Sequence, residues 1–528
     1  MSFSKLHVFS LYLTTLLCVT GCGSEPAPEP SAPAGPSTSS VELPTQPLDQ
    51  PAGEHYANTA WPTVHRDGSN SDYVALNPTP NVEMAWHVLD GAALLIGPII
   101  GPEGNLYATT GQGADTSHLH AFDKTGALLW QTAPMQSLDD FDYAAVVSAP
   151  IIDADGNLYA GDSNQLWSFT AAGDVRWTAS FVEGGGEGFM ITPIFTHEGH
   201  VGGITSDGVL LVYDRVTGAL AYDPMELPGV AGQPSVPAPP GLWGGGFLAE
   251  AFVQPLWDVI YGRAVEVANT PAVHPDTGRI FMSATGTTPE QGVLYGIDTS
   301  TEGATIAFET PIGAGSGTSP AISPDGQAVY VANEAGVMSA IDTQSGDVIW
   351  TAENAQGQAS PSIGPDGMVY TFDPVAGDVI AIRGDTGDLK WKRTYHNLAE
   401  AGLSRSLVAK REVAINSIIT VTDNGLWIAM DLCYLFERGE QNFRQPQAVW
   451  VFHLDAETGD VLGSFEAPGS SSAFVTPDQD GNLYMSLGEV TTTISTYGVN
   501  PRLPGPLKSD YAPTGGLVAF RPGVPEAD

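Results

Sequence analysis

A short phrase recurs eight times along this chain, and its spacing constrains the fold more than any other feature. Each copy contains a small residue and often a proline, an apolar pair, a glycine-containing turn, two apolar strands, a Thr-Gly-like turn and an aromatic residue. Four antiparallel strands per copy are predicted, and one copy per roughly 40 residues predicts a blade of an all-β propeller. The clearest copies run from Ser148 to Trp177, Ser319 to Trp350 and Ser360 to Trp391, and looser copies begin near Gly97, Thr192, Thr270, Asn416 and Ser471.

The number of blades follows from a missing strand. An aromatic residue, such as Trp177 or Trp350, closes the outermost strand of most copies, but the last copy stops at 519–522 without such a strand. The segment Val82–Val88 precedes the first copy and has the composition of the missing strand, including Trp86. We predict that it completes an eighth four-stranded antiparallel blade and closes the ring. The recurrent tryptophans are expected to pack between blades.

The N-terminus predicts a cleaved signal. Lys5 precedes the largely apolar run 6–19, which is shorter than the ~20 residues that a membrane span needs. The ending Val19-Thr20-Gly21-Cys22 resembles a bacterial lipoprotein signal, which implies removal of residues 1–21 and lipid modification, including palmitate, at Cys22. Gly23 after the cysteine implies sorting to the outer membrane. The alternative is an ordinary secreted protein with an incidental cysteine.

Composition divides the rest of the chain. Residues 22–55 are rich in Pro, Ser and Ala and are predicted to form a disordered tether, whereas aromatic content returns in an ordered lead-in. The expected domains are the signal (1–21), the lipidated tether (22–55), the lead-in (56–81), the propeller (82–522) with insertions at about 224–268, 394–412 and 433–447, and a short tail (523–528).

The charge balance excludes one class of partner. The chain has 60 acidic against 19 basic residues and a formal net charge of −41. Nucleic-acid binding needs a basic face, and none is visible. Most acids fall in turns and on exposed strand faces, so a solvated surface is expected, with a surface rich in bound divalent cations as the alternative.

Cysteine usage adds no chemistry to the propeller. Cys18 leaves with the signal and Cys22 carries the lipid, so Cys433 remains alone and no intramolecular disulfide can form. Its apolar setting predicts a buried thiol, with a mixed disulfide or a reactive role as the alternative. The chain has no CxxCH motif, which excludes covalently attached haem.

Three patterns are candidates for metal sites. The turns with Asp153 and Asp155 and with Asp478 and Asp480 offer oxygens at alternate positions, but they lack the glycine and glutamate spacing of an EF-hand and suit tight hairpin turns. His118 and His120 point to one face of a strand without an identifiable third ligand. His197-Glu198-Gly199-His200 is one residue short of HExxH and aligns with a hairpin turn.

The insertions are the candidates for partner binding, because the repeat does not need them. Residues 248–260 could form a short helix that presents Phe252 and Trp257, and it could instead simply cap the ring. The insertion 394–412 has helical spacing. Nine bases and eight acids share residues 383–444, and the bases proposed to contact an acidic partner are Arg405, Lys410, Arg411, Arg438 and Arg444. Solvated ion pairs are the alternative.

The recurring DGxxY, AxD and GxxxW elements resemble the quinoprotein, or PQQ-like, propeller family over essentially the whole chain after the tether. One branch of that family comprises dehydrogenases that hold pyrroloquinoline quinone and calcium in the central funnel. The other comprises noncatalytic lipoproteins that hold partner proteins, such as the propeller subunit of the outer-membrane β-barrel assembly machinery. The catalytic branch implies a disulfide between adjacent cysteines, a Glu, Asn and Asp set around calcium, a base near the quinone and a catalytic Asp. No such set aligns here.

These observations favour a noncatalytic, lipid-anchored propeller that binds envelope or outer-membrane proteins without a cofactor. It is expected to be a monomeric propeller attached to the outer membrane. A role in outer-membrane protein assembly is the specific form of this hypothesis. The alternatives are a dehydrogenase that depends on PQQ and calcium, and capture of a glycan or peptide in the central funnel.

Overall fold

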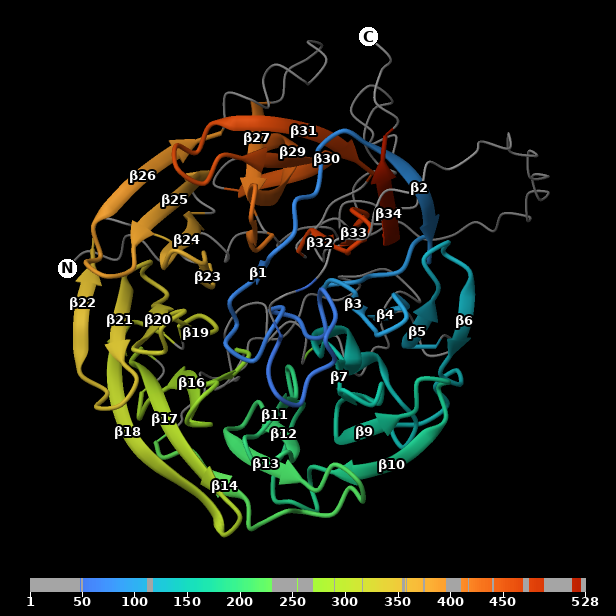
Figure 1. The fold of residues 1–528 in the computed structure, drawn as a ribbon, viewed down its shortest axis with the longest axis vertical. Helices are drawn as coiled ribbons and strands as arrows, with labels where there is room; N and C mark the ends of the chain where they lie inside the picture. Colours follow the sequence, from blue (N-terminus) through green and yellow to red (C-terminus); the bar gives the residue numbers. More distant parts are fainter. Residues whose placement is uncertain are drawn as a thin grey trace.

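The strands form eight sheets around a central axis, like the blades of a propeller (Figure 1). The computed structural model describes residues 48, 51–111, 117–229, 254, 269–288, 290–315, 317–353, 357, 359–373, 376–395, 410–415, 417–438, 441–468, 474–488 and 515–523. Within these ranges the chain is all-β apart from the 3-10 helix η1 (Tyr143–Val147) and the helical residue Gln254. None of the described helices is long and apolar enough to cross a membrane. The predicted eight-bladed propeller is confirmed.

In the first six blades the innermost strand comes first, and its partners follow outward. The first four blades are β3 (Ile99–Ile100), β4 (Leu106–Thr109), β5 (Leu119–Phe122) and β6 (Leu128–Gln131); β7 (Ile151–Ile152), β8 (Leu158–Gly161), β9 (Gln165–Phe169) and β10 (Val175–Ser180); β11 (Ile194–Phe195), β12 (Val201–Ile204), β13 (Val209–Tyr213) and β14 (Met225–Glu226); and β15 (Ala272–Val273), β16 (Ile280–Thr285), β17 (Gly292–Ser300) and β18 (Gly303–Gly313).

Blades five to eight follow the same plan, with two added strands in the seventh. They are β19 (Ala321–Ile322), β20 (Ala328–Ala332), β21 (Met338–Asp342) and β22 (Val348–Ala352); β23 (Ser362–Ile363), β24 (Met368–Asp373), β25 (Asp378–Arg383) and β26 (Leu389–Thr394); β28 (Thr420–Thr422), β29 (Gly425–Arg438), β30 (Gln441–Leu454) and β31 (Val461–Ala467), with β1 (Tyr73–Val74) beside β28 and β27 (Lys410–Ile415) beside β29; and β32 (Thr476–Pro477), β33 (Leu483–Leu487), β34 (Gly516–Pro522) and β2 (Val82–Val88).

The eighth blade joins the two ends of the propeller. Strand β2 pairs antiparallel with β34, from Val82 opposite Pro522 to Val88 opposite Leu517. The Arg521 Nε atom also contacts Glu83 Oε1 at 2.8 Å. The predicted closure by an N-terminal strand is therefore confirmed, and it leaves no gap in the ring where the propeller begins and ends.

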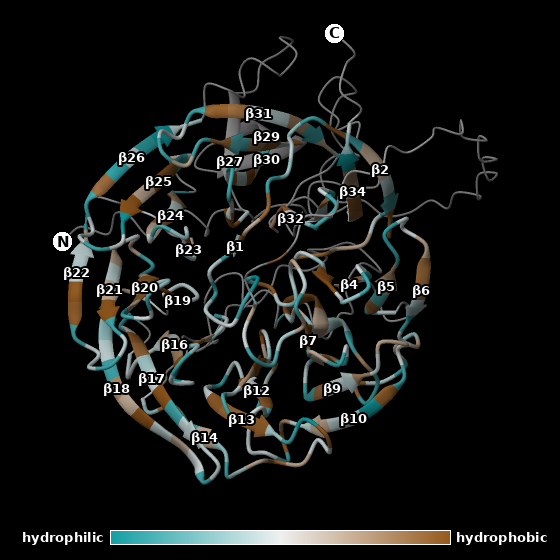
Figure 2. Ribbon diagram, in the orientation of Figure 1, coloured by the Kyte–Doolittle hydropathy of each residue, from teal (hydrophilic) through white to brown (hydrophobic). Residues whose placement is uncertain are grey.

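The hydrophobic core lies between neighbouring blades. One cluster joins Tyr107 and Leu119 of the first blade to Leu158 and Trp167 of the second, and other interfaces have clusters of the same kind. Apolar residues concentrate in the strands, and hydrophilic residues in the turns that join them (Figure 2). Burial of these apolar faces contributes about 25 cal/mol per Å², so each blade depends on its neighbours for stability.

An aromatic residue at the outer edge of most blades caps a turn glycine of the next blade. Trp350 of β22 donates its indole N–H to the Gly384 carbonyl at 2.8 Å. A Cβ added at Gly387, whose φ is +76°, would lie 2.7 Å from the Trp350 ring. The indole therefore requires glycine in the turn beneath it. The same indole-to-carbonyl bond is made by Trp86 to Lys124, Trp130 to Ala171, Trp177 to Arg215 and Trp391 to Ala456.

The two ends of the ring differ in their connections. The turns from the first to the second strand and from the third to the fourth strand of each blade lie at one end, here called the turn end. The remaining connections start and finish at the opposite end, here called the insertion end. The predicted insertions 224–268 and 394–412 connect consecutive blades, and 433–447 is the hairpin of β29 and β30. All three therefore belong to the insertion end.

One prediction for the insertions was wrong in part. The helical spacing of residues 394–412 does not persist at its end, because Lys410–Ile415 forms strand β27 and pairs with β29. An available strand edge satisfies the backbone of this segment and overrides its local preference. Residues 396–409 lie outside the described part of the chain. So does the proposed helix 248–260, except for Gln254, which is helical.

The aromatic caps can be tested with two glycines of the sixth blade. Gly387→Ala and Gly367→Ala both place alanine at a left-handed backbone position (φ +76° and +79°), which costs about 1–2 kcal/mol. The added methyl at residue 387 also meets Trp350, whereas nothing lies within 4 Å at residue 367. We expect Gly387→Ala to lower the free energy of unfolding by about 1–3 kcal/mol more than Gly367→Ala in denaturant titrations. Equal losses would show that the indole does not constrain the turn.

Candidate functional site

The lead-in covers the central axis at the turn end (Figure 1). The second residue of six innermost strands donates its backbone N–H to a carbonyl of this segment, at 2.6–3.1 Å. One segment of the chain thus follows the inner edge of the ring from blade to blade. The pairs are Ile100 to Trp61, Ile152 to Pro62, Val273 to Gly68, Ile322 to Ser69, Ile363 to Ser71 and Val421 to Asp72.

In the two remaining blades, the second residue of the innermost strand does not donate to a backbone carbonyl of the lead-in. In the third blade the backbone amide of Phe195 hydrogen-bonds the Tyr56 hydroxyl, and the two rings pack edge to face at 4.8 Å. In the eighth blade the position is Pro477, which has no N–H to satisfy. A buried backbone donor without a partner is costly. The lead-in therefore completes the hydrogen bonding of the inner strands.

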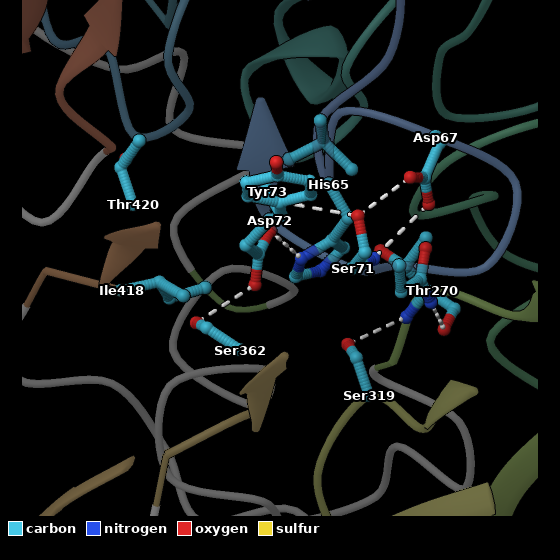
Figure 3. Close-up of polar contacts among 12 residues, drawn as sticks. His65, Asp67, Ser71, Asp72, Tyr73, Thr270, Ser319, Ser362, Ile418 and Thr420 are labelled. Atoms are coloured by element: carbon cyan, nitrogen blue, oxygen red, sulfur yellow. Dashed lines mark hydrogen bonds and ion pairs between the residues drawn. The ribbon is translucent and has the colours of Figure 1, made fainter. Parts of the chain in front are cut away.

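Polar side chains of the lead-in, among them His65 and Asp72 (Figure 3), anchor it at the axis. Asp72 is fully buried between His65, whose Nδ1 lies 2.9 Å from Oδ1, and Ser362, which donates its hydroxyl to Oδ2 at 3.0 Å. The Asn70 side chain donates to three carbonyls of the fourth and fifth blades, at Thr270, Pro271 and Pro320.

These contacts hold the backbone in an unfavourable conformation. Arg66, Asn70 and Asp72 have φ values of 70°, 57° and 57°, in the left-handed region that most residues avoid. Each costs of the order of 1 kcal/mol, least for Asn and Asp. The side-chain contacts of Asn70 and Asp72 offset this cost, so the path of the lead-in depends on them.

Aromatic packing fills the axis next to the polar cluster. The His65 and Phe474 rings meet edge to face at 5.3 Å, and Trp61 lies 5.5 Å from Phe474. Burial raises the pKa of Asp72 to about 6, and the neighbouring His65 and the Ser362 hydroxyl limit the rise. The axis at the turn end is thus occupied by packed side chains and a buried carboxyl group.

The candidate calcium turns use their oxygens within the protein. Asp153 Oδ1 accepts the backbone N–H groups of Asp155 and Asn157, and its Oδ2 accepts the Tyr159 hydroxyl at 2.9 Å. Asp478 has the equivalent contacts, and Asp480 forms an ion pair with Lys124. These are the contacts of Asx-type hairpin turns. Across the described ranges, no three His, Cys, Asp or Glu side chains form a group that could hold a metal ion.

The histidine candidates lie in two different settings. His118 and His120 are buried, and the Nδ1 atom of His118 lies 3.0 Å from the Thr110 carbonyl. Burial lowers the pKa of both, to about 4 for His120, so both imidazoles are neutral at pH 7. The segment from His197 to His200 forms the turn between β11 and β12, with Gly199 at φ +83°.

Four of the proposed partner-binding bases share the sheet of the seventh blade. Lys410 of β27 lies opposite Leu435 of β29, which in turn lies opposite Arg444 of β30. Arg411 follows Lys410 in β27, and Arg438 ends β29. The fold therefore places these positions at the insertion end of one sheet. Arg405, Phe252, Trp257 and the lipidation candidate Cys22 lie outside the described residues, and Cys433 is described only by its register opposite Pro446.

The described side chains do not fit a quinone at the axis. The resemblance to quinoproteins implies a base near the quinone oxygens. Among the Lys and Arg side chains that the structure describes, only Arg66 lies beside the axis, where it donates to the Pro51 carbonyl and contacts Asp67. The others belong to turns or to the outer two strands of the blades.

The sequence predicted an ordered lead-in packed beneath the ring, but not its role in completing the hydrogen bonding of the inner strands. Its cluster of His, Asp, Ser, Asn and Gly residues between 65 and 72 has no strand or helix periodicity. Such a segment beside a repeat array is a signal for irregular backbone held by side chains.

The buried carboxyl group predicts a specific pH dependence. Because the folded pKa of Asp72 is raised above its usual 3.8 to about 6, its contribution to stability is present below pH 4 and is lost as the pH rises through 6. Relative to Asp72→Asn, the wild-type free energy of unfolding should fall by about 2–3 kcal/mol between pH 4 and 7.5. Denaturant titrations at several pH values measure this difference, and the exposed Asp155→Asn is the control. If the difference in free energy of unfolding between wild type and Asp72→Asn does not change with pH, the raised pKa of Asp72 is contradicted.

The comparisons with known proteins agree with this architecture. The protein family described as outer membrane protein assembly factor BamB matches residues 115–238 and 254–432, which is more than half of the chain. Protein Rv3035 of Mycobacterium tuberculosis is 26% identical over 295 residues, covering 55% of this chain. That match spans 65% of the relative, which is less than two thirds of its length.

Two solved structures match most of this chain. A europium-containing methanol dehydrogenase covers 90% of this chain and 99% of its own, with a TM-score of 0.55 and 12% identity. BamB from Moraxella catarrhalis covers 83% of this chain and 99% of its own, with a TM-score of 0.47 and 13% identity. The first likeness shows the propeller fold alone. On the family match, the chain belongs to the PQQ-like propeller family described as outer membrane protein assembly factor BamB.

Proposed function

We propose that this protein is a lipid-anchored, noncatalytic scaffold of the bacterial cell envelope that binds a partner protein at the insertion end of its ring. The observation that carries the proposal is that the predicted insertions all belong to one end of the ring. The three predicted insertions belong to the insertion end, whereas the lead-in and tight turns occupy the turn end. A scaffold that needs only its blades has no structural need for these insertions, so binding is their expected role.

The seventh blade offers the best-defined part of this surface. Strands β29 and β30 are 14 residues long, while the second and third strands of the first blade have only four each. Strand β27 adds a third strand to this extension. A site on extended strands is held more rigidly than one on loops, which favours specific recognition.

Charge favours a partner with an acidic surface. Residues 383–444 have a net charge of about +1 within a chain of net charge −41. The extension of the seventh blade holds Lys410, Arg411, Arg438 and Arg444. Complementary charge at such a surface increases the association rate and the discrimination against other partners.

Membership of the BamB family supports outer-membrane protein assembly as the setting. Attachment through Cys22 rests on the signal-like sequence before it. A quinoprotein dehydrogenase is the second candidate, and the fold it shares with methanol dehydrogenase is its only structural support. Capture of a glycan or peptide in the funnel is the third.

Replacing Arg405, Lys410 and Arg411 together by Ser should reduce recovery of the partner at least tenfold, because complementary charge favours association. The melting temperature should stay unchanged, since the backbone makes the pairing of β27 with β29. The measurement is affinity purification of the tagged protein from its own envelope in mild detergent, with mass spectrometry of proteins and small molecules.

A matched control removes three bases at the turn end, in the variant Lys124→Ser, Arg383→Ser and Arg521→Ser. This variant should recover the partner as well as wild type does. Equal recovery by both variants would remove the basic surface from the proposal. Recovery of a quinone with calcium, and of no stoichiometric protein, would replace the scaffold by a dehydrogenase.

The anchor has a separate test. Cys22→Ser should move the protein from the membrane fraction to the soluble fraction, because the thiol is the site of lipid attachment. Metabolic labelling with palmitate measures the modification directly. A variant that stays in the membrane fraction would contradict lipid anchoring at this cysteine.

A further inference from the structure

A groove crosses the turn end between the lead-in and the inner turns. One wall consists of the turns at Pro275, Pro324 and Pro365, which belong to the fourth, fifth and sixth blades. The other wall consists of residues 51–54, which precede the lead-in, and of the lead-in residues Tyr56 and 67–75; the groove also reaches Ala154 of the second blade. Its volume is about 910 Å³. Because three consecutive blades form one wall, the groove follows the ring and suits an elongated ligand.

The lining of the groove is largely apolar and rich in proline. Pro51, Pro275, Pro324 and Pro365 are exposed along it, as is Ala154. Tyr56 and Tyr73 contribute to its lining. Grooves lined by aromatic side chains recognise proline-rich segments in the polyproline II conformation.

The backbone of the groove offers little for strand addition. The lead-in carbonyls of Gly68, Ser69, Ser71 and Asp72 already accept N–H groups from the innermost strands. A ligand that needs a ladder of main-chain hydrogen bonds would find these acceptors occupied. A proline-rich segment has few N–H groups and no internal hydrogen bonds, so it loses least on binding here.

Carboxylates border the groove. Glu54 lines it, and Asp276, Asp325 and Asp366 directly follow the three prolines of its wall. Asp325 and Asp366 also line a neighbouring cavity of the fifth and sixth blades, which contains Arg383 and Lys390. All four are exposed, and none forms an ion pair with a base among the described residues. A cationic ligand would be attracted to these carboxylates, and an anionic ligand would be repelled by them.

We infer that this groove is a second docking site, which binds a basic, proline-containing extended segment of a partner protein. The proposal is independent of the insertion end, since the groove lies at the opposite end of the ring. A propeller with both sites could hold two proteins at once.

The test uses the full-length protein and a fluorescein-labelled (Arg-Pro-Pro)₃ peptide, which spans about 28 Å in the polyproline II conformation. Fluorescence anisotropy measures its dissociation constant at low and moderate salt. We expect saturable binding that weakens with salt. Binding to (Glu-Pro-Pro)₃ should be absent, and binding to (Arg-Gly-Ser)₃, which has the same charge, should be at least tenfold weaker.

Two variants locate the site. Asp276→Asn, Asp325→Asn and Asp366→Asn together should raise the dissociation constant at least tenfold, and Ala154→Trp, which fills one end of the groove, should do the same without a charge change. The matched control neutralises three exposed carboxylates of outer turns, Asp174, Asp347 and Asp388, none of which lines the groove.

Each other outcome overturns the proposal. Equal weakening by the control triple would mean that the peptide responds only to the overall negative charge. Binding unaffected by Ala154→Trp would place the peptide elsewhere. Binding that appears only after deletion of residues 23–47 would make the chain's own proline-rich tether the occupant. Dimerisation abolished by Ala154→Trp would make the occupant a second copy.

Discussion

The backbone donors on the inner edge of the ring impose the constraint on which the rest of the structure depends. Each blade begins with a very short innermost strand, and the second residue of that strand directs its N–H toward the axis. The lead-in satisfies seven of these positions, and the eighth is Pro477, which has no donor. A single irregular segment thus closes the turn end, and its three left-handed residues are held by buried side chains.

At the outer edge of the ring, a second recurrent contact also satisfies an N–H donor and joins neighbouring blades. An indole from one blade lies on a turn glycine of the next, and its N–H is satisfied by that turn. This contact couples neighbouring blades at the turn end, where the turns must stay short. The insertion end has no such requirement. Additions to the chain have accumulated there, and this separation of a constrained end from a permissive one supports partner binding at the insertion end.

The acidic residues have several different structural roles. Some, such as Asp153 and Asp478, use their oxygens to organise hairpin turns. Asp72 is buried at the axis and has a raised pKa. Others border the groove at the turn end and remain exposed. The net charge of −41 therefore comes from carboxylates with different structural roles. Only the exposed carboxylates are available to a cationic partner.

The sequence by itself determined the propeller, its eight blades, its closure by Val82–Val88 and the packing of the tryptophans. These features belong to the repeat or complete it. The same pattern of strands and turns therefore occurs in several copies, and local sequence is enough to predict it. The helical spacing of residues 394–412 was misleading at its end, because Lys410–Ile415 pairs with Met430–Leu435 further along the chain.

Only the tertiary structure decided the role of the lead-in and the positions of the two candidate surfaces. Residues 65–72 have no periodicity, and their partners, such as Ser362 and Pro320, lie about 250 to 300 residues further along the chain. The groove likewise exists only where the lead-in meets three separate turns. Contacts between distant segments leave no local pattern in a sequence, since they depend on how the ring closes rather than on the residues beside them.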